Sequence, residues 1–547
     1  MRFKRLIEPR LDEPLPLWMI FPVIFTALYA THFTLLSVPY YWDEAGYYIP
    51  AAWDFFRTGS LIPITTLTNA HPPLPSIYLA LWWKTSGFLP EVTREAVLMV
   101  ASMGLLAVWR LAMRLVGVPA VAFWTVLLTG LYPIWFAQSS LAHADIFAAA
   151  CTLWGLAYAL PNSDRKPWAA ALWFSAAALS KETAIAIPLT LAALSFIEAF
   201  RAQPPVRRRL LLETAWLSSC VLPLAAWYAW HYFKTGFLFG NPAFLRYNAQ
   251  ANLSPVRFLA AFGHRILHLT AHMNLFVPVL MTIAALLLAP RPDAEGHERA
   301  SIARSVLYRI LVLVLVNAAL FSVLGGALLT RYLLPMYPLI LLVAVTTFYR
   351  RVPFWHGVAV FCAAAFLVGL FVNPPYGFAP EDNLAYARVV RMHLAGIAQL
   401  EHRYPGATVL SAWPMTDELT RPELGYVKQP IDVARIEDFT PAQIGIAAQE
   451  PEKYSAALVF STKYDPPPLL ASLRLESEAM EERFFGLHHD LPPEAIAREL
   501  GGDLVWKKED QGQWIALIRF NRQFEARLGI LNRRSAPHSM DKAQATQ

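Results

Sequence analysis

Charged residues are the scarcest feature of this 547-residue chain, since Asp, Glu, Lys and Arg make up only 16% of it. Soluble proteins of this size contain roughly a quarter charged residues. The shortage is uneven, because apolar runs recur from residue 15 to about residue 373, whereas residues 375–547 are mixed, charged and contain proline. We therefore predict a polytopic membrane domain followed by a soluble domain. The modest net charge of +6 gives no indication of nucleic acid as a partner.

Cysteine is also rare, and a cleavage site and an internal repeat are both missing. The three cysteines lie inside apolar runs without metal-binding spacing, so the sequence indicates neither a disulfide framework nor a cysteine metal site. The basic N-terminus precedes a long apolar run with no small-residue cleavage site, which predicts an uncleaved first span. No repeat period is evident, although paired repeats are typical of transporters.

The apolar runs predict a polytopic α-helical membrane protein with about 11 transmembrane helices. Residues 74–90 are apolar but interrupted by Lys84, which favours a helix lying at the membrane interface over a full crossing. The expected spans are residues 15–38, 95–113, 119–138, 146–160, 168–180, 184–199, 211–231, 272–289, 310–327, 332–348 and 353–373.

The basic residues orient these spans. With a cytoplasmic N-terminus and alternating crossings, the cytoplasmic loops hold roughly twice as many Lys and Arg residues as the outer loops, as the positive-inside rule requires. This orientation places Asp43, Asp145, Lys181 and Arg331 at the outer face, together with everything after residue 373.

The C-terminal part predicts a small α/β soluble domain. Apolar runs at 407–413, 456–462 and 514–520 are typical of strands, and helical patterns cover 382–404 and 493–500. The expected organisation is a membrane domain over 1–373, an extracytoplasmic domain over 375–530 and a disordered polar tail over 531–547.

Two adjacent acids, Asp43 and Glu44, follow the first apolar run in the segment YYWDEAGYY. Charged groups at the end of a span are costly in apolar surroundings and indicate chemistry at the membrane surface, although a solvated acidic loop is the simpler alternative. Asp145 lies at the start of another apolar run. It is either a second acid of this surface or an ordinary acid that caps the first turn of a helix.

Cationic candidates lie at the same face. Lys181 is expected to pair with Glu182 or with a phosphate, and Arg331, followed by Tyr332, either extends to the interface or holds a phosphate. His71 begins the segment HPPL, where two prolines interrupt regular structure. A lone histidine is usually structural. Together these groups match what a lipid-linked phosphate donor requires: cations for the phosphate, an acid for the acceptor and apolar surface for the lipid.

The segments WDEAGYY, HPPL, AHADIFAAA, SKET and RYLLPMYP occur in an order and spacing that resembles a known family. Over roughly residues 15–350 the chain is similar to bacterial polyprenol-phosphate-sugar glycosyltransferases of the C superfamily (GT-C), near the protein O-mannosyltransferases and the lipid A aminoarabinose transferase. His71-Pro72 departs from the Lys-Pro of the aminoarabinose transferases, and the β-trefoil insert of eukaryotic protein mannosyltransferases is absent.

The resemblance implies a hexosyl- or pentosyltransferase that moves a sugar from a polyprenyl-phosphate-linked donor to a hydroxyl of a lipid, glycan or protein acceptor. It implies the bacterial cytoplasmic (inner) membrane, surrounded by membrane lipids, as the location. A divalent metal ion held by Asp43 and Asp145 is left open, and no other cofactor is expected. By position, the implied catalytic residues are Asp43, Glu44 and Asp145, and the implied donor-phosphate contacts are Lys181, Arg331, Tyr332 and His71.

Two other classes of protein remain as alternatives. A transporter or flippase of lipid-linked sugars would also need intramembrane charges and a lipid groove, but it would usually show paired repeats with broken helices. A structural membrane scaffold would not need Asp43, Lys181 and Arg331 on one face. The sequence leaves the sugar, the acceptor and the stereochemical outcome open.

Overall fold

The computed structural model describes residues 16–160, 165–249, 253–293, 296–464, 478–486 and 488–520. It divides into two compact units, the first comprising Met1–Val390 and Tyr464–Leu487 and the second Arg391–Lys463 and His488–Gln547. The division lies at Val390, inside α18 (Ala385–Arg403), whereas the sequence analysis places the domain boundary at residues 373–375. The predicted tail, 531–547, lies outside the described residues.

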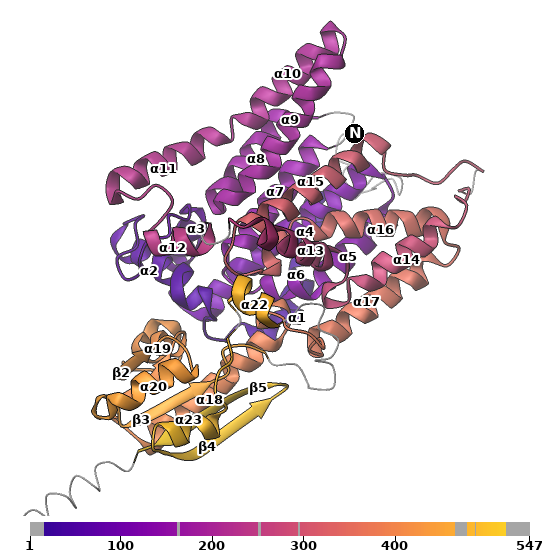
Figure 1. The fold of residues 1–547 in the computed structure, drawn as a ribbon. Coiled ribbons are helices and arrows are strands. Elements are labelled where there is room, and N and C mark those ends of the chain that lie inside the picture. The colour runs from indigo at the N-terminus through magenta and orange to yellow at the C-terminus, as the bar shows by residue number, and fades with distance from the viewer. Residues whose placement is uncertain are drawn as a thin grey trace, which may run out of the picture. The chain divides into compact units, whose positions relative to one another are not determined.

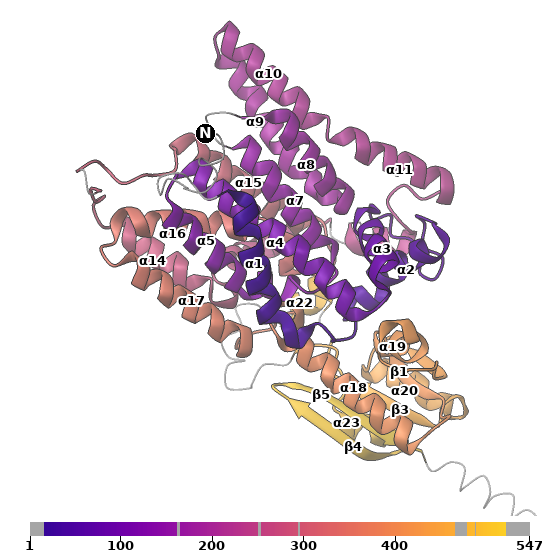
Figure 2. The same cartoon turned by 180° about the vertical axis from the view of Figure 1, so that it is seen from behind.

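The first unit is a bundle of helices (Figures 1 and 2). Within the described chain, five helical segments are long and apolar enough to cross a membrane, and a sixth span arises if the bent pair α13 and α14 counts as one. The chain is therefore a multi-pass membrane protein. These segments are α1 with η2 (Leu17–Leu35), α4 (Pro90–Leu115), η4 with α9 (Glu182–Arg201), α10 with α11 (Pro204–Thr235) and α15 (Arg304–Val323), and the bent pair is α13 (Pro255–Thr270) with η6 (His272–Asn274) and α14 (Phe276–Leu286).

The other predicted spans coincide with helices that are shorter than a bilayer-crossing helix usually is. The length and apolar composition of the helices therefore identify fewer spans than the eleven that the apolar runs predict. These shorter helices are α5 (Pro119–Leu131), α6 (Pro133–Gln138), α7 (Ala144–Ala159), α8 (Pro167–Ser180), α16 (Tyr337–Arg351) and α17 (Trp355–Phe371). Helix α3 (Leu74–Ser86) covers the segment that was expected at the membrane interface. The helices α2 (Ile49–Thr58), α12 (Pro242–Asn248) and α22 (Glu478–Phe485) also lie outside the predicted spans.

Helix α13 was not among the predicted spans, because Arg257 and Arg265 interrupt its apolar pattern. Both guanidinium groups are buried against backbone carbonyl oxygens near the C-terminal end of α15. Arg265 donates to the carbonyl of Phe321, in the last turn of α15, which the helix leaves without a partner, and to the carbonyl of Leu329, just before Thr330. The two arginines thereby fix the turn that leads from α15 to Arg331.

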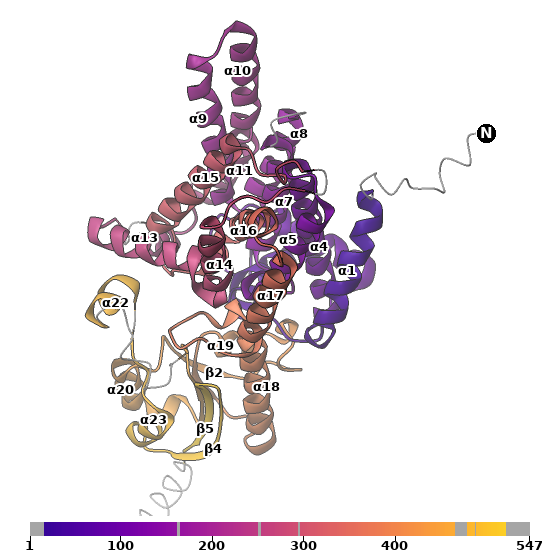
Figure 3. The same ribbon diagram turned by 90° about the vertical axis from the view of Figure 1, so that its right-hand side faces the viewer.

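Helices α7 and α8 pack closely as an antiparallel pair (Figures 1 and 2). Gly155 allows this approach, because a Cβ atom there would lie 2.6 Å from the ring of Phe174. Asp145 stands in the first turn of α7 and Lys181 directly follows α8, so the pairing brings these two residues to the same end of the bundle. At the other end, α9 and α10 extend beyond the neighbouring helices (Figures 1 and 3).

The second unit contains a five-stranded sheet in the order β2-β1-β3-β5-β4, with β1 parallel to β2 and β3, and β5 antiparallel to β3 and β4. The three predicted strands and the two predicted helical stretches are confirmed, as β1, β3, β5, α18 and α23. The elements are β1 (Val409–Ala412), α19 (Met415–Thr420), β2 (Val433–Ile436), α20 (Pro441–Gln449), β3 (Ala456–Phe460), α23 (Pro493–Glu499), β4 (Asp503–Asp510) and β5 (Gln513–Arg519).

The two strands that the sequence analysis missed are the edges of this sheet. Neither β2 nor β4 contains a fully buried residue, so neither shows the apolar run that identifies a central strand. Strand β4 joins β5 through Gln511 and Gly512, which both have positive φ angles of 46° and 83°. Two-residue hairpin turns with this geometry match the twist of the paired strands.

Candidate active site

Asp43 lies at the start of a one-turn π-helix, η3 (Glu44–Tyr48), that follows the first span. Trp42, just before it, has a left-handed φ of 48°, which is uncommon for a bulky residue. Strained backbone and π-helical turns both occur preferentially at functional sites. The Asp43 side chain is 37% exposed, which makes it the accessible acid of this region.

Glu44, its neighbour, is fully buried and bound on both oxygens. Arg94 of α4 pairs with both Oε1 and Oε2, while the backbone N–H groups of Ala142 and Tyr41 donate to Oε1 at 2.5 Å and to Oε2 at 2.9 Å. Arg94 also donates to the carbonyl of Ser140 at 2.6 Å. Glu44 therefore ties the Asp43 loop to the loop before Asp145, and its oxygens are not free to act on a substrate.

Removing this buried charge should destabilise the protein. Glu44→Gln leaves Arg94 without its counter-charge, and breaking a buried pair costs about 3–5 kcal/mol. We expect a clearly lower unfolding temperature in detergent, measured on the purified protein. Glu298→Gln is the matched control, because Glu298 pairs with Arg350 at an exposed position and such pairs contribute about 1 kcal/mol or less. Equal melting of the two variants would contradict the assigned role of Glu44.

Arg331 stands at the centre of the site, in η7 (Thr330–Leu333), and is 2% exposed. Its Nη2 donates to Asp43 Oδ2, its Nη1 donates to Glu381 Oε1, and its Nε lies 3.2 Å from Asp145 Oδ2. One guanidinium group thus joins acids from three separate segments of the chain. Carboxylates thus occupy both Nη1 and Nη2, whereas Nε makes no hydrogen bond among the described residues. An anion that binds through two parallel hydrogen bonds would have to replace at least one of the carboxylates.

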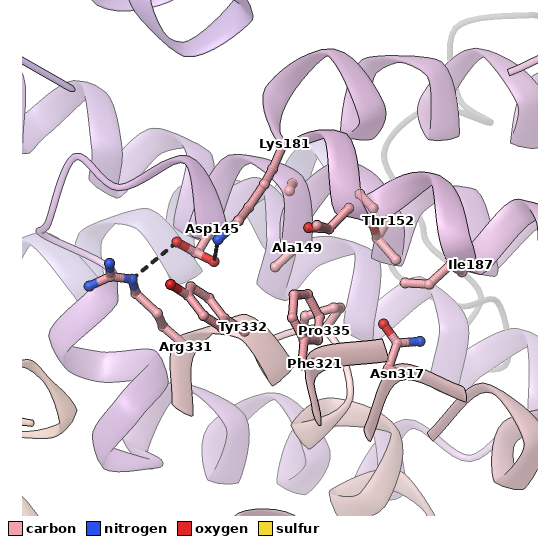
Figure 4. A pocket seen from close by; sticks show the side chains of 13 residues that line it. Asp145, Ala149, Thr152, Lys181, Ile187, Asn317, Phe321, Arg331, Tyr332 and Pro335 are labelled. Atoms are coloured by element: carbon pink, nitrogen blue, oxygen red, sulfur yellow. Dashed lines mark hydrogen bonds and ion pairs between the residues drawn. The ribbon is translucent and has the colours of Figure 1, made fainter. Parts of the chain in front are cut away.

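Lys181 provides the second cation (Figure 4). Its Nζ lies 2.5 Å from Asp145 Oδ1 and 4.0 Å from the ring centre of Tyr332, where a cation–π contact is favourable. The sequence analysis considered Glu182 or a phosphate as its partner. In the structure the partner is Asp145, because the pairing of α7 with α8 brings the two side chains together.

Glu182 instead pairs with His71, whose Nδ1 lies 2.9 Å from Oε2 of the carboxylate. The ring of Tyr48 stacks on His71 with centres 5.9 Å apart, and its centre lies 5.8 Å from that of the His143 ring. His71 therefore lies next to the cluster, in contact with the same tyrosine as His143. The structure brings together Asp43, Asp145, Lys181, Arg331 and Tyr332, and leaves His71 beside them and Glu44 beneath.

A narrow pocket continues from these charged groups between α7, α9 and α15 (Figure 4). Small residues form its α7 side, at positions that share one helical face. The pocket therefore has a charged end and a mainly apolar wall, and its volume is about 20 Å³, close to that of one water molecule. Its lining comprises Asp145, Ala148, Ala149, Thr152, Lys181, Thr183, Ala184, Ile187, Asn317, Phe321, Arg331, Tyr332 and Pro335.

Three members of the cluster were missed from the sequence: Glu381, His143 and Gln138. Glu381 lies in η8 (Pro380–Asp382), beyond the predicted end of the membrane domain, so it was not considered with the outer loops. His143 and Gln138 belong to the turn between α6 and α7 and look like ordinary polar turn residues. An acid directly after the last span, in a segment expected on the outer face, was the signal available for Glu381.

A divalent metal ion at Asp43 and Asp145 does not fit this geometry. The guanidinium of Arg331 contacts one oxygen of each carboxylate, and Lys181 contacts the other oxygen of Asp145. Hard divalent ions need several oxygen ligands around one point, and such a point here would lie beside two cations. Across the described residues, no group of three or more His, Cys, Asp or Glu side chains is arranged to hold a metal ion.

The sequence matches no family model and no curated protein. The fold, however, matches crystal structures of ArnT from Cupriavidus metallidurans. With ArnT bound to undecaprenyl phosphate, the TM-score is 0.53 at 15% identity, covering 91% of this chain and 97% of ArnT. With ArnT in the apo state, the TM-score is 0.51 at 15% identity, covering 92% and 98%. The resemblance to the GT-C aminoarabinose transferases is thus confirmed for the fold.

Proposed function

Because this chain has the fold of ArnT along nearly its whole length, we propose that it is a membrane glycosyltransferase with a polyprenyl-phosphate-linked sugar as donor. The observation that carries the proposal is that the site combines an accessible acid with two buried cations. Asp43 is accessible, whereas Arg331 and Lys181 are buried at the head of an apolar pocket. ArnT has been crystallised with undecaprenyl phosphate, a lipid whose anionic head could pair with cations such as Arg331 and Lys181.

In the proposed reaction, the carboxylate of Asp43 removes the proton from an acceptor hydroxyl. The hydroxyl oxygen then forms a bond to the anomeric carbon of the sugar, and the bond from that carbon to the phosphate oxygen breaks. Polyprenyl phosphate leaves with the electron pair of that bond, and Arg331 and Lys181 offset its growing negative charge. Asp43 carries the proton away. A single displacement of this kind inverts the anomeric centre.

Asp145 has a positioning role in this scheme. Its two oxygens face Lys181 and Arg331, so it holds both cations at the same end of the pocket before the donor arrives. Preorganised charges stabilise a transition state without having to rearrange during the reaction. The ring of Tyr332 adds a cation–π contact that stabilises Lys181 at this position.

The acceptor is proposed to be a hydroxyl group of a lipid, a glycan or a protein at the outer face of the bacterial inner membrane, and the sugar a hexose or a pentose. A transporter or flippase of lipid-linked sugars was the alternative from the sequence. The fold shared with ArnT favours the transferase.

Purified protein incubated with synthetic polyprenyl-phosphate sugars and candidate acceptors tests this proposal. We expect polyprenyl phosphate to be released in step with a glycosylated acceptor for at least one pair of substrates. Movement of an intact donor across reconstituted vesicles, without release of polyprenyl phosphate, would instead establish the flippase.

The proposed orientation has its own test. The N-terminus is expected in the cytoplasm and residues 375–547 outside, because the basic loops favour that arrangement about two to one. A reporter that is active only after export should be active when fused after about residue 380, and inactive when fused after α9, near residue 203. A cytoplasmic reporter that is active at the first position would overturn the orientation and the outer-face location of the site.

A further inference from the structure

Glu381 is a buried acid whose two oxygens have different surroundings. Oε1 accepts a hydrogen bond from Arg331, while Oε2 has no hydrogen-bond partner among the described residues. The closest ring nitrogen to Oε2 is Nε2 of His143, 4.0 Å away, which also lacks a partner in the described part of the chain. Two buried polar atoms thus face each other, although buried polar atoms are nearly always satisfied.

The neighbouring residues determine which of these two side chains carries a proton. Gln138 donates its Nε2 hydrogen to the backbone carbonyl of Glu381 at 3.4 Å, which turns its amide oxygen toward His143. That oxygen lies 2.9 Å from His143 Nδ1, so Nδ1 must carry the hydrogen. Burial, and then the positive charges of Arg331, Lys181 and Arg94, lower the pKa of His143 well below its ordinary value. The ring is therefore neutral and Nε2 presents a lone pair.

A lone pair on His143 facing an ionised carboxylate would place two acceptors opposite each other. If Glu381 carries a proton on Oε2, that proton can reach the His143 lone pair through one water molecule, since 4.0 Å is too long for a direct hydrogen bond. Burial raises the pKa of Glu381 to about 8, with further upward contributions from the carboxylates of Asp43, Asp382 and Asp145 and a downward one from Arg331. The geometry and the electrostatics agree on a carboxyl group that holds a proton near neutral pH.

The charge of the site points the same way. With Asp43, Asp145 and Glu381 all ionised, three negative charges surround the two positive charges of Arg331 and Lys181. An anionic donor would then enter a site that is already negative. With Glu381 protonated the charges balance, and the phosphate meets a neutral cluster.

We infer that Glu381 is a third acid of the site, which occupies the Arg331 guanidinium until the donor phosphate replaces it and which must be protonated for the phosphate to bind. This inference rests on the proposed function, since it names how the same site admits its donor. Phosphate binding to Arg331 and proton uptake by Glu381 are then coupled, so each favours the other. Glu381 positions Arg331 and sets the net charge around it, and it does not touch the reacting atoms.

The expected sign follows from the charges. As the pH rises through the pKa of Glu381, the acid loses its proton and adds a negative charge beside the phosphate site, so affinity for the phosphate falls. One linked proton gives about a tenfold weaker affinity per pH unit above that pKa. The titratable or charged groups that face Glu381 directly or across Arg331 are Arg331, Asp43, Asp145, Lys181, His143, Asp382, His272, Tyr48 and Tyr332.

The test is binding of polyprenyl phosphate to the purified full-length protein between pH 7 and 9.5, above the second phosphate ionisation at about 6. Wild-type affinity should fall toward a tenfold loss per unit at the alkaline end. Glu381→Gln imitates the protonated acid, so its affinity should stay nearly constant and exceed that of the wild type at pH 9.5. Glu298→Gln, which removes an exposed carboxylate, should behave as the wild type.

Each other outcome has one meaning. If Glu381→Gln shows the same slope as the wild type, a group other than Glu381 is titrating and the inference is wrong. A wild-type affinity that is flat over this range also overturns it. If the lipid does not bind the wild type at any pH, the proposed function itself fails. Melting temperatures measured on the same samples show whether Glu381→Gln is folded, and Glu381→Ala, which also removes the charge, should flatten the slope in the same way.

Discussion

Sugar transfer by Asp43→Asn should be about two to four orders of magnitude slower than by the wild type, which is the usual contribution of a general base. The amide keeps the size of the side chain and can no longer accept the acceptor's proton. Arg331 keeps Asp145 and Glu381 as partners, so the phosphate site should survive the change. The measurement is the initial rate of transfer alongside the affinity for polyprenyl phosphate.

Asp503→Asn is a suitable control, because Asp503 is an exposed acid of the second unit that pairs with Arg519. It should leave both the rate and the affinity unchanged. Near-normal turnover by Asp43→Asn would make Asp43 an ordinary loop carboxylate, and the general base would have to be sought elsewhere.

Arg331→Lys should weaken the binding of polyprenyl phosphate about tenfold to a hundredfold. A lysine keeps the positive charge but loses the planar fork that can hold a phosphate through two parallel hydrogen bonds. One or two charged hydrogen bonds of about 1.5–3 kcal/mol account for a loss of this size. In the structure the same fork joins Asp43 and Glu381, so lysine should also loosen the contact between their segments.

Lys181→Ala should reduce the affinity as well, since it removes the second cation and leaves Asp145 with Arg331 alone. Lys234→Ala is the matched control, because Lys234 is exposed in the last turn of α11. If both Arg331→Lys and Lys181→Ala bind the lipid as tightly as the wild type, these cations serve only to anchor the chain at the interface, and the donor site lies elsewhere.

The helical membrane architecture could be predicted because it follows from apolar runs, and the central strands could be predicted for the same reason. Helix α13 could not, because its arginines are satisfied by carbonyl groups from α15 that only the folded chain brings near them. The edge strands β2 and β4 lack a buried face, so their sequences carry little signal.

The candidate site was partly visible in the sequence for a similar reason. Asp43, Asp145, Lys181 and Arg331 stand at ends of apolar runs, where an isolated charge attracts notice. Their pairing depends on how helices pack: Glu182 is next to Lys181 in sequence, yet Asp145 is its partner in space. Asp43 and Glu44 are adjacent acids that look equivalent in the sequence. Only the burial of Glu44 against Arg94 shows that Glu44 is structural and Asp43 is accessible.

The narrow pocket below the charged cluster bears on which lipids can reach it. Its α7 wall is a single helical face of small residues, Ala148, Ala149 and Thr152, with Ile187 and Phe321 on the neighbouring helices. The space between these walls is about 20 Å³, close to that of one water molecule, so a hydrocarbon chain can enter only if α7, α9 and α15 move apart. Ordinary two-chain phospholipids also carry a phosphate, so Arg331 and Lys181 alone could not reject them. Parting the helices for two chains disturbs more packing than parting them for one, so the number of tails would favour a single-chain donor over the surrounding phospholipids.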